Sequence, residues 1–408
     1  MAARRYDIQS QAYKRNPHPT LWEMIEAGPM VRIKIPMVGS YLAVTPHEAV
    51  SDLLRDRKRF VRDPRSAGLR MGDVLPWWFP RSMRPMANSM IIRDEPDHRR
   101  LRGLVEQAFL RRSIERMRDR LETVADEMLD DLEAEQKRSG KPVDLVSGLA
   151  RPFPLAVICE LLGLPQSDRP RFVRQAEFMT RISLWRLPGL YGAMTGMLTY
   201  IREQIRLRRA EPNDGLITEL IAAEEQGDKL SEDELVSMVI LLLFAGHVTT
   251  VHLIGGGIHT LLAHPEQKRA LMADWSAAER AIDEMLRYLS PVQITKPMMP
   301  ATDMEWRGQR LKRGEKIVAM LAAANADRAK FEHPERFDMN RDPNPHVAFG
   351  MGIHTCLGWK LAKVETEIAL GRLFTRFSDL EATLPLDEAK WSRQLGTRGM
   401  EVLPVRLG

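Results

Sequence analysis

Apolar residues return every three or four positions along most of the chain from residue 97 to residue 290. This spacing is typical of amphipathic helices, and prolines and glycines at the junctions mark their ends. We therefore expect helices at Asp97–Leu110, Ser113–Arg138, Leu155–Leu162, Asp168–Leu184, Tyr191–Arg209, Leu216–Glu225, Ser231–Leu262, Pro265–Ala273 and Ser276–Ser290. Two further helices are expected, at Thr20–Ala27 and directly after Gly358.

Alternating apolar and polar positions are confined to short segments nearer the two ends of the chain. Such alternation predicts strands at Met30–Ile35, Tyr41–Val44, Gln293–Pro300, Met304–Trp306 and Glu315–Met320, with a last one near the C-terminus. The segments Pro64–Ser89 and Asn325–Pro345 show neither pattern and are expected to be loops. The chain is therefore predicted to be mainly α, with small peripheral β-sheets.

Composition adds limits to this picture. The chain has 408 residues, of which 44% are hydrophobic and 28% charged, as in an ordinary globular protein. Because no Ser/Gly-rich linker divides it, we expect one domain over residues 1–408. The net charge of +5 is mild, and no basic tract is interleaved with aromatic residues, so we expect no nucleic-acid partner.

The N-terminal segment Met1–Asp7 contains no apolar stretch of signal-peptide or anchor length. The densest apolar segment, Leu235–Ala245, is predicted to be too short to cross a membrane. We therefore expect a cytoplasmic protein without a membrane anchor.

The chain has two cysteines, which excludes a disulfide framework and a zinc site built of several thiolates. Cys159 lies in an apolar helical run and is expected in the core. Cys356 lies in the segment 349–358, which reads Phe-Gly-Met-Gly-Ile-His-Thr-Cys-Leu-Gly and precedes a helical pattern. A thiolate at a helix N-terminus has a lowered pKa, and a soft anionic sulfur suits iron. The alternative is a buried structural cysteine beside a hydrogen-bonded histidine.

The long helix predicted at about 231–262 begins with Ser231 and Glu234, which form a capping-box pattern. Its middle reads Phe244-Ala-Gly-His-Val-Thr-Thr250. Small residues followed by paired threonines predict a place where the helix opens and a flat ligand approaches. Close packing of another helix across Ala245 and Gly246 is the alternative.

The segment 349–358 resembles the cysteine-ligand loop of the cytochromes P450, Phe-Gly-x-Gly-x-His-x-Cys-x-Gly, at every fixed position. The resemblance implies the cytochrome P450 fold, a single haem-centred domain with haem b (iron protoporphyrin IX) as cofactor. Cys356 would then be the iron ligand, with Phe349, Gly350 and Gly358 shaping the loop around the cofactor.

The long helix resembles the family's oxygen-activating segment, Ala/Gly-Gly-x-Asp/Glu-Thr-Thr. The match implies that Ala245 and Gly246 lie over the haem and that Thr249, followed by Thr250, hydrogen-bonds dioxygen. Val248 departs from the pattern, because it occupies the position of the acid that helps to relay protons. Substitutes for that acid are His247, His252 or a water chain.

Further matches concern the haem propionates and the core. His98 and Arg102, four residues apart, resemble the propionate-binding His-x-x-x-Arg pair, and His354 matches a third partner. The family's fourth partner, an arginine, is replaced by Met298, and Lys296 is expected to supply that charge. The family's structural core motif, Glu-x-x-Arg with a later arginine, is matched by Glu284, Arg287 and Arg336. The lid over the substrate pocket is matched by aromatic and methionine side chains, namely Trp77, Trp78, Phe79 and Met86.

The resemblance implies a haem-thiolate monooxygenase that activates dioxygen with two electrons from a ferredoxin and its reductase. It would oxidise a small or medium organic molecule, as in secondary metabolism. An acidic ferredoxin is expected to dock near the Arg-rich segment 99–102 and near Lys360 and Lys363. Val248 leaves oxidative coupling or peroxide-driven oxidation as the alternative. A non-catalytic haem sensor or carrier and a cofactor-free helical protein are the remaining ones.

Overall fold

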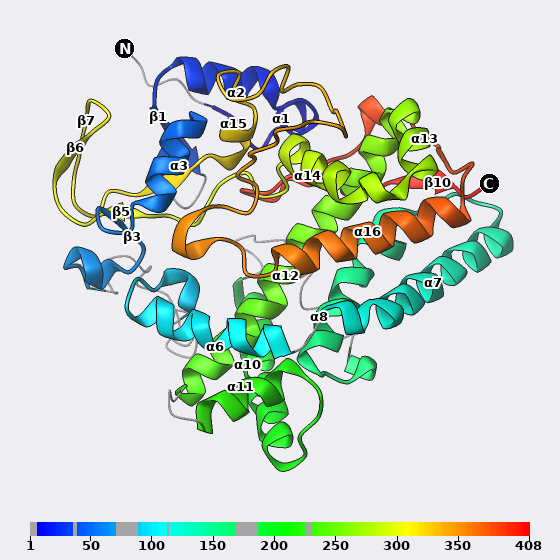
Figure 1. Ribbon diagram of the computed structural model, residues 1–408, viewed down its shortest axis with the longest axis horizontal. Helices are drawn as coiled ribbons and strands as arrows, with labels where there is room; N and C mark the ends of the chain where they lie inside the picture. The colour runs from blue at the N-terminus through cyan, green and yellow to red at the C-terminus, as the bar shows by residue number, and fades with distance from the viewer. Residues whose placement is uncertain (1–5, 36–38, 71–88, 112–113, 169–186, 226–229) are drawn as a thin grey trace. The chain divides into compact units, whose positions relative to one another are not determined.

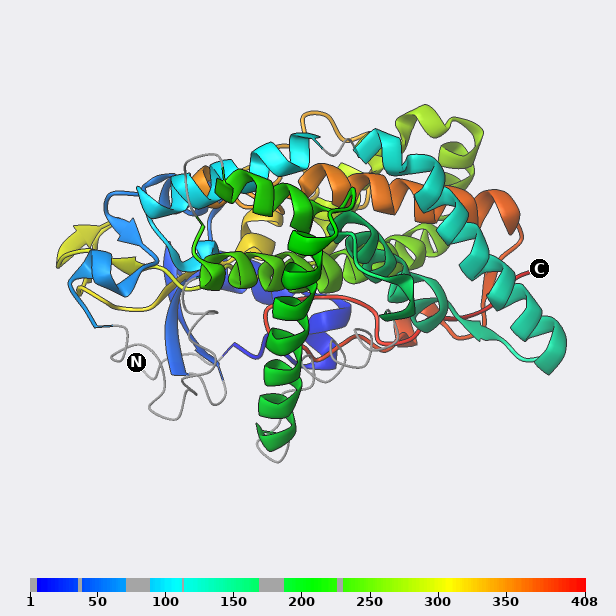
Figure 2. The same ribbon diagram turned by 90° about the horizontal axis from the view of Figure 1, so that it is seen from below.

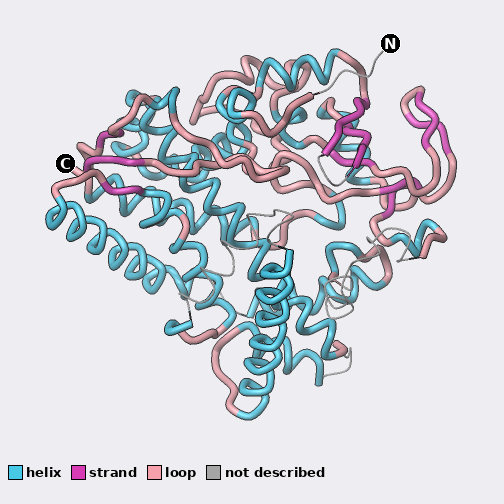
Figure 3. Tube along the Cα trace, turned by 180° about the vertical axis from the view of Figure 1, so that it is seen from behind, coloured by secondary structure: helices cyan, strands magenta, loops and turns pink. Residues whose placement is uncertain are grey.

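The computed structural model describes residues 6–35, 39–70, 89–111, 114–168, 187–225 and 230–408. The chain divides into two compact units. The first unit comprises Met1–Val61, Glu122–Arg151 and Thr249–Gly408, and the second comprises Arg62–Leu121 and Pro152–Val248. In the described parts of both units helices predominate over short strands (Figures 1 and 3).

The helices fall into three groups. The first unit holds α1 (Gln11–Arg15), α2 (His18–Glu26), α3 (His47–Arg55), α13 (Pro265–Ala273), α14 (Ala278–Leu289), α15 (Leu321–Asn325) and α16 (Trp359–Arg376). The second unit holds α6 (Asp97–Arg111), α8 (Pro152–Leu162), α10 (Leu187–Ala210) and α11 (Leu216–Glu225). Two long helices have residues in both units: α7 (Ile114–Ser139), the long teal helix of Figure 2, and α12 (Glu232–Ala263).

All described strands belong to the first unit and form small sheets. In one sheet β1 (Met30–Ile35) pairs antiparallel with β2 (Gly39–Val44), and β2 pairs parallel with β8 (Ile317–Ala319). A second sheet has the order β4 (Val143–Asp144), β10 (Pro404–Arg406) and β9 (Glu381–Ala382). Two-stranded pairs are formed by β3 (Phe60–Val61) with β5 (Met299–Pro300), and by β6 (Met304–Trp306) with β7 (Gln309–Leu311).

The predicted fold class is confirmed, and most predicted helices are present with ends shifted by a few residues. The predicted strand Gln293–Pro300 was wrong over most of its length, because only Met299–Pro300 forms a strand. Pro297 has no N–H to donate, and Ile294 and Met298 make only isolated bridges. The predicted helix Asp168–Leu184 lies almost entirely outside the described residues.

The apolar segment Leu235–Ala245 is part of the longer helix α12, and a helix must be both long and apolar to cross a membrane. Among the described residues, α12 is the one helix long and apolar enough to do so by length and composition. However, 67% of its most apolar window is buried inside the protein, as in the core helix of a globular protein. The predicted capping box is present, because the Ser231 N–H donates to Glu234 Oε2 at 2.8 Å.

The first unit buries two cations where the N-terminal helix α1 meets the C-terminal segment. Lys14 Nζ donates to the main-chain oxygens of Thr397 and Gln394 and to Gln293 Oε1. Arg398 Nε donates to the Lys14 oxygen at 2.7 Å. Burial, together with the charge of Arg398, lowers the pKa of Lys14 to about 7.

We predict that this buried lysine makes the protein more stable at alkaline pH. Between pH about 7 and about 10.5 the unfolded chain holds a proton on Lys14 that the folded chain has lost. The free energy of unfolding should therefore rise with pH in this range, relative to that of Lys14→Met. Urea unfolding at several pH values measures the difference, with the exposed Lys58→Met as control. Parallel pH profiles of wild type and Lys14→Met would contradict this expectation.

Candidate functional site

The loop that carries Cys356 is held by its own main chain. The Cys356 N–H donates to the Phe349 carbonyl oxygen at 2.9 Å, which closes the loop directly before α16. The Gly350 N–H donates to the Val347 oxygen at 2.9 Å. Cys356 is half-buried, while His354 lies half-buried in the short 3-10 turn Gly352–His354. The loop therefore presents the sulfur close to the N-terminus of a helix, as the sequence predicted.

Gly352 is required by a close approach of two backbones. It has a φ of 72°, and a Cβ at this position would lie 2.2 Å from the Leu54 carbonyl oxygen at the end of α3. Neither this contact nor the conformation tolerates a side chain. Gly350 is also left-handed, with a φ of 69°. The two loop glycines thus serve turn geometry and close packing.

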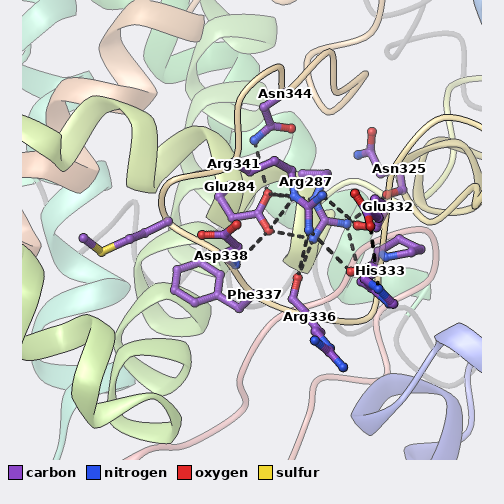
Figure 4. Close-up of polar contacts among 12 residues, drawn as sticks. Glu284, Arg287, Asn325, Glu332, His333, Arg336, Phe337, Asp338, Arg341 and Asn344 are labelled. Carbon is purple, nitrogen blue, oxygen red and sulfur yellow. Dashed lines mark hydrogen bonds and ion pairs between the residues drawn. The ribbon is translucent and has the colours of Figure 1, made fainter.

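A buried ion pair on α14 supports this loop (Figure 4). Glu284 and Arg287 are fully buried, and Arg287 donates to both carboxylate oxygens of Glu284 at 2.7 Å. The remaining guanidinium N–H groups donate to the main-chain oxygens of Asn325, Pro334 and Arg336 at 2.8 to 3.1 Å. The pair therefore fixes the course of two chain segments that precede the cysteine loop.

Asn325 transmits this constraint to the loop. Its carbonyl oxygen accepts from Arg287, and its side-chain Oδ1 accepts from the Val347 N–H at 2.8 Å. Its Nδ2 donates to Ser290 Oγ at 3.0 Å, so both ends of its side-chain amide are hydrogen-bonded inside the protein. Val347 is two residues before Phe349, the residue whose oxygen binds the Cys356 N–H.

The third member of the core motif differs from the predicted one. The Arg336 side chain is exposed, and this residue contributes its main-chain oxygen instead. Arg341 takes the predicted place, because its Nε lies 3.2 and 3.1 Å from the two oxygens of Glu284 (Figure 4). Sequence spacing alone gave no reason to choose Arg341 over Arg336, because both arginines lie in the same predicted loop, Asn325–Pro345.

On α12 the accessible residues form one stripe. Between residues 235 and 258 the helix is buried except at Leu241, Phe244, Ala245, Gly246, Val248 and Thr249. Their spacing of three and four residues places most of them on one helix face. Ala245 is exposed, and among the described residues a Cβ on Gly246 would meet only Ile158, at an ordinary 3.6 Å. Among the described residues, close helix packing therefore does not explain these small residues, and the approach of a flat ligand along the stripe stays a prediction.

The remaining predicted residues of this helix lie away from the stripe. His247, Thr250 and His252 are buried, and His252 Nε2 is 3.3 Å from Gln394 Oε1 in the first unit. The helix remains α-helical from Glu232 to Ala263, so the expected opening of its hydrogen-bond ladder is not present. Sequence reasoning missed Gly256, where a Cβ would approach Leu289 to 2.9 Å, although a glycine run in an apolar helix was a usable signal.

In the second unit, α6 carries the two predicted propionate partners. His98 is buried, and its pKa is lowered to about 4 by burial and by the charges of Arg102 and Arg62. Arg102 is partly exposed and its Nε lies 2.6 Å from Glu106 Oε1. The neighbouring Arg100 forms an ion pair of 2.5 Å with Glu234 at the start of α12.

The structure does not describe the predicted lid residues, and it does not place Lys296 as a buried substitute for the missing arginine. Trp77, Trp78, Phe79 and Met86, expected to cover a substrate pocket, lie outside the described residues. Lys296 is exposed, while Met298 at the position of the missing arginine is buried.

We predict that Arg341, and not Arg336, stabilises the buried carboxylate. Arg341→Met should lower the free energy of unfolding by about 2 kcal/mol, because charge-assisted hydrogen bonds to a buried group are lost. Arg336→Met keeps the main-chain oxygen and should stay within about 0.5 kcal/mol of wild type. Chemical unfolding of both variants measures this, and equal losses would contradict the assignment.

The sequence is similar to that of known proteins over nearly its whole length. The family model described as Cytochrome P450 matches residues 190–396. Polyketide biosynthesis cytochrome P450 PksS of Bacillus subtilis (strain 168) is 36% identical over 398 residues, covering 97% of this chain and 96% of that protein. The 6-deoxyerythronolide B hydroxylase of Saccharopolyspora erythraea is 35% identical over 405 residues, covering 98% of each chain.

Solved structures agree with the sequence relatives. The structure of PksS has a TM-score of 0.88 at 35% identity, covering 99% of this chain and 100% of its own. The myxobacterial cytochrome P450 CYP267B1 in complex with myristic acid also has a TM-score of 0.88 at 35% identity, covering 98% of both chains. A cysteine loop of the family pattern and similarity over nearly the whole length lead to one conclusion. The chain belongs to the cytochrome P450 family, and it is therefore an oxidoreductase whose cofactor is a thiolate-ligated haem b.

Proposed function

We propose that this protein is a bacterial-type monooxygenase that uses two electrons from a ferredoxin to oxidise an organic molecule. The observation that carries the proposal is the loop 349–358, whose main chain holds Cys356 before α16 with the full family pattern. A haem bound through this thiolate supplies the oxygen chemistry, because electron donation by sulfur favours O–O cleavage. The protein orients the substrate and manages protons and electrons.

Each of the predicted site residues then has a defined role. Cys356 would hold the iron, while His98, Arg102 and His354 would bind the propionates through charged or polar N–H groups. Ala245 and Gly246 would leave room for the porphyrin plane along the accessible stripe of α12. Thr249 on the same stripe would donate a hydrogen bond to dioxygen. Together these roles require one domain over residues 1–408, which remains a prediction.

The substrate is expected to be an apolar molecule of medium size. The relatives act in polyketide biosynthesis and on 6-deoxyerythronolide B, and a structural neighbour holds myristic acid. The accessible stripe of α12 presents Leu241, Phe244 and Val248, which suits a polyketide or fatty-acyl chain. A cytoplasmic location agrees with this role, since such substrates and reduced ferredoxins are made there.

The electron donor is expected to dock beside the cysteine loop. Trp359, three residues after Cys356, is one of the few exposed large hydrophobic residues of the described chain. Lys360 is exposed, with its Nζ 5.4 Å from the centroid of that indole. Lys363, in contrast, is paired with Glu279 at 2.8 Å and Asp283 at 3.0 Å. Trp359 and Lys360 therefore offer an aromatic contact and a free charge to an acidic ferredoxin, whereas Lys363 does not.

We predict that Cys356→Ala abolishes the thiolate signature in the spectrum of the reduced, CO-bound protein. Sulfur is the only ligand that gives this signature, and alanine cannot replace it. Cys159→Ala is the matched control, because Cys159 is the other cysteine and lies buried in α8. The control should keep the signature. An unchanged spectrum of Cys356→Ala would refute the assignment of the iron ligand.

A second candidate, peroxide-driven oxidation or oxidative coupling, is favoured by Val248 alone. Valine carries no proton, and it lies on the accessible stripe where the family has an acid. In this case hydrogen peroxide should support turnover better than dioxygen with a ferredoxin and its reductase.

We predict that Val248→Asp raises the rate of dioxygen-coupled turnover several-fold, because a carboxylate can relay protons near neutral pH. Val248→Asn has nearly the same shape but cannot ionise, so it should leave the rate unchanged. Product formation is measured with ferredoxin and reductase and, separately, with hydrogen peroxide alone. Equal rates of Val248→Asp and wild type, with substrate binding intact, would show that proton supply does not limit the reaction.

A further inference from the structure

Arg398, in the C-terminal segment of the first unit, carries a buried positive charge that the candidate site does not use. Its guanidinium donates to the main-chain oxygens of Lys14 at 2.7 Å, Arg15 at 3.1 Å and Leu289 at 3.3 Å. These hydrogen bonds use three of its five N–H groups. The neutral oxygens satisfy part of the guanidinium, but they do not cancel its charge.

Among the described residues, no carboxylate compensates this charge. Burial lowers the pKa of Arg398 to about 10, and the groups that oppose this shift are the phenols of Tyr288 and Tyr13. Burial also raises the pKa of Tyr13 far above its ordinary value, so its hydroxyl is neutral. Lys14 adds a second buried cation, whose partners are two main-chain oxygens and the side-chain oxygen of Gln293. Two buried like charges without a negative partner are costly, and a bound anion removes that cost.

Two neutral donors beside these cations have no hydrogen-bond partner among the described residues. They are the Tyr13 hydroxyl and Gln293 Nε2. Their side chains are buried, with exposed fractions of 3% and 1%. The Gln293 side chain lies close enough to the Tyr13 hydroxyl to oppose the rise of its pKa, and its Oε1 is 3.4 Å from Lys14 Nζ. Because the two donor atoms do not bond to each other, a third group can accept from both.

A small cavity of the same unit adjoins this cluster. Its volume is about 10 Å³, which is the space that one water molecule or small ion needs. Gln293 and Leu289 are among the residues that line it, and the Leu289 main-chain oxygen is a partner of Arg398. Arg287 lines it as well, but the charge of Arg287 is paired with Glu284. The cavity therefore has room for one small acceptor beside an uncompensated cation.

We propose that this cluster binds one small monovalent anion such as chloride. The anion accepts from the Tyr13 hydroxyl, from Gln293 Nε2 and from an N–H group of Arg398 that the main chain does not use, and it compensates the charges of Arg398 and Lys14. It thereby joins α1, which carries Tyr13 and Lys14, to the segment after α14 and to the C-terminal segment. The site lies outside the cysteine loop, so this inference goes beyond the proposed function.

The first test measures urea unfolding of the full-length holoprotein at pH 6, in sodium chloride and in sodium gluconate of equal ionic strength. At this pH Lys14 carries its charge, because burial lowers its pKa only to about 7. Gluconate is too large for the cavity. When chloride exceeds its dissociation constant about tenfold, the unfolding constant of wild type should fall about tenfold. Equal unfolding constants in the two salts would overturn the proposal.

The variant Gln293→Glu supplies a carboxylate beside both cations. It should be more stable than wild type in gluconate and should lose the response to chloride, because the negative charge then belongs to the chain. Tyr13→Phe removes one donor and should weaken the response. Gln309→Glu is the matched control, since Gln309 belongs to the same unit but donates to the Met30 oxygen, and it should respond like wild type. A full response to chloride in Gln293→Glu would count against the site. If that variant does not fold, Tyr13→Phe decides, and an undiminished response there would refute the proposal.

The second test locates the ion. Crystals of the holoprotein grown in sodium bromide should show an anomalous peak between the Tyr13 hydroxyl and the Gln293 amide. Bromide peaks at surface positions only, which denote an adventitious ion only, would overturn the proposal. Density at the cluster without an anomalous signal would overturn it too, because that result identifies a water molecule.

Discussion

The buried pair of Glu284 and Arg287 is the constraint on which the site depends. A fully buried carboxylate is tolerated because Arg287 and Arg341 both donate to it, and Arg287 uses its remaining N–H groups on three main-chain oxygens. A buried ion pair of this kind adds little net stability, but removing one partner is strongly destabilising. Its value lies in specifying one course for residues 325–347. That course ends at the hydrogen bond between Asn325 and Val347, from which the cysteine loop begins.

The helix α12 belongs to the core and also carries an accessible stripe, and residues of both kinds are interleaved in its sequence. Most of it is core, with glycines such as Gly256 and Gly257 allowing close approach of Leu289 and Met285. One stripe remains accessible, and Ala245, Gly246 and Thr249, the residues that we propose to face the haem and dioxygen, lie on it. The valine at position 248 shares that stripe, so its effect on proton supply would be direct. The buried His247 and His252 lie off the stripe, which makes them poorer substitutes for an acid.

Much of this could be predicted from the sequence, and the failures have physical causes. Helical periodicity located the main helices, and the cysteine loop was recognisable because glycines and a histidine stand at fixed positions around Cys356. The choice of Arg336 over Arg341 failed because an ion-pair partner is set by how an irregular loop folds, and spacing does not encode that.

The contact between Gly352 and the Leu54 carbonyl links the sulfur-bearing loop to a helix some 300 positions earlier in the chain. The position of the cysteine loop thus depends on residues from both ends of the sequence. Chimeras that exchange the first 61 residues with those of a relative would have to preserve the end of α3 together with the loop. Substitutions that shift the end of α3 would, for the same reason, press on the cysteine loop although they lie far from it in sequence.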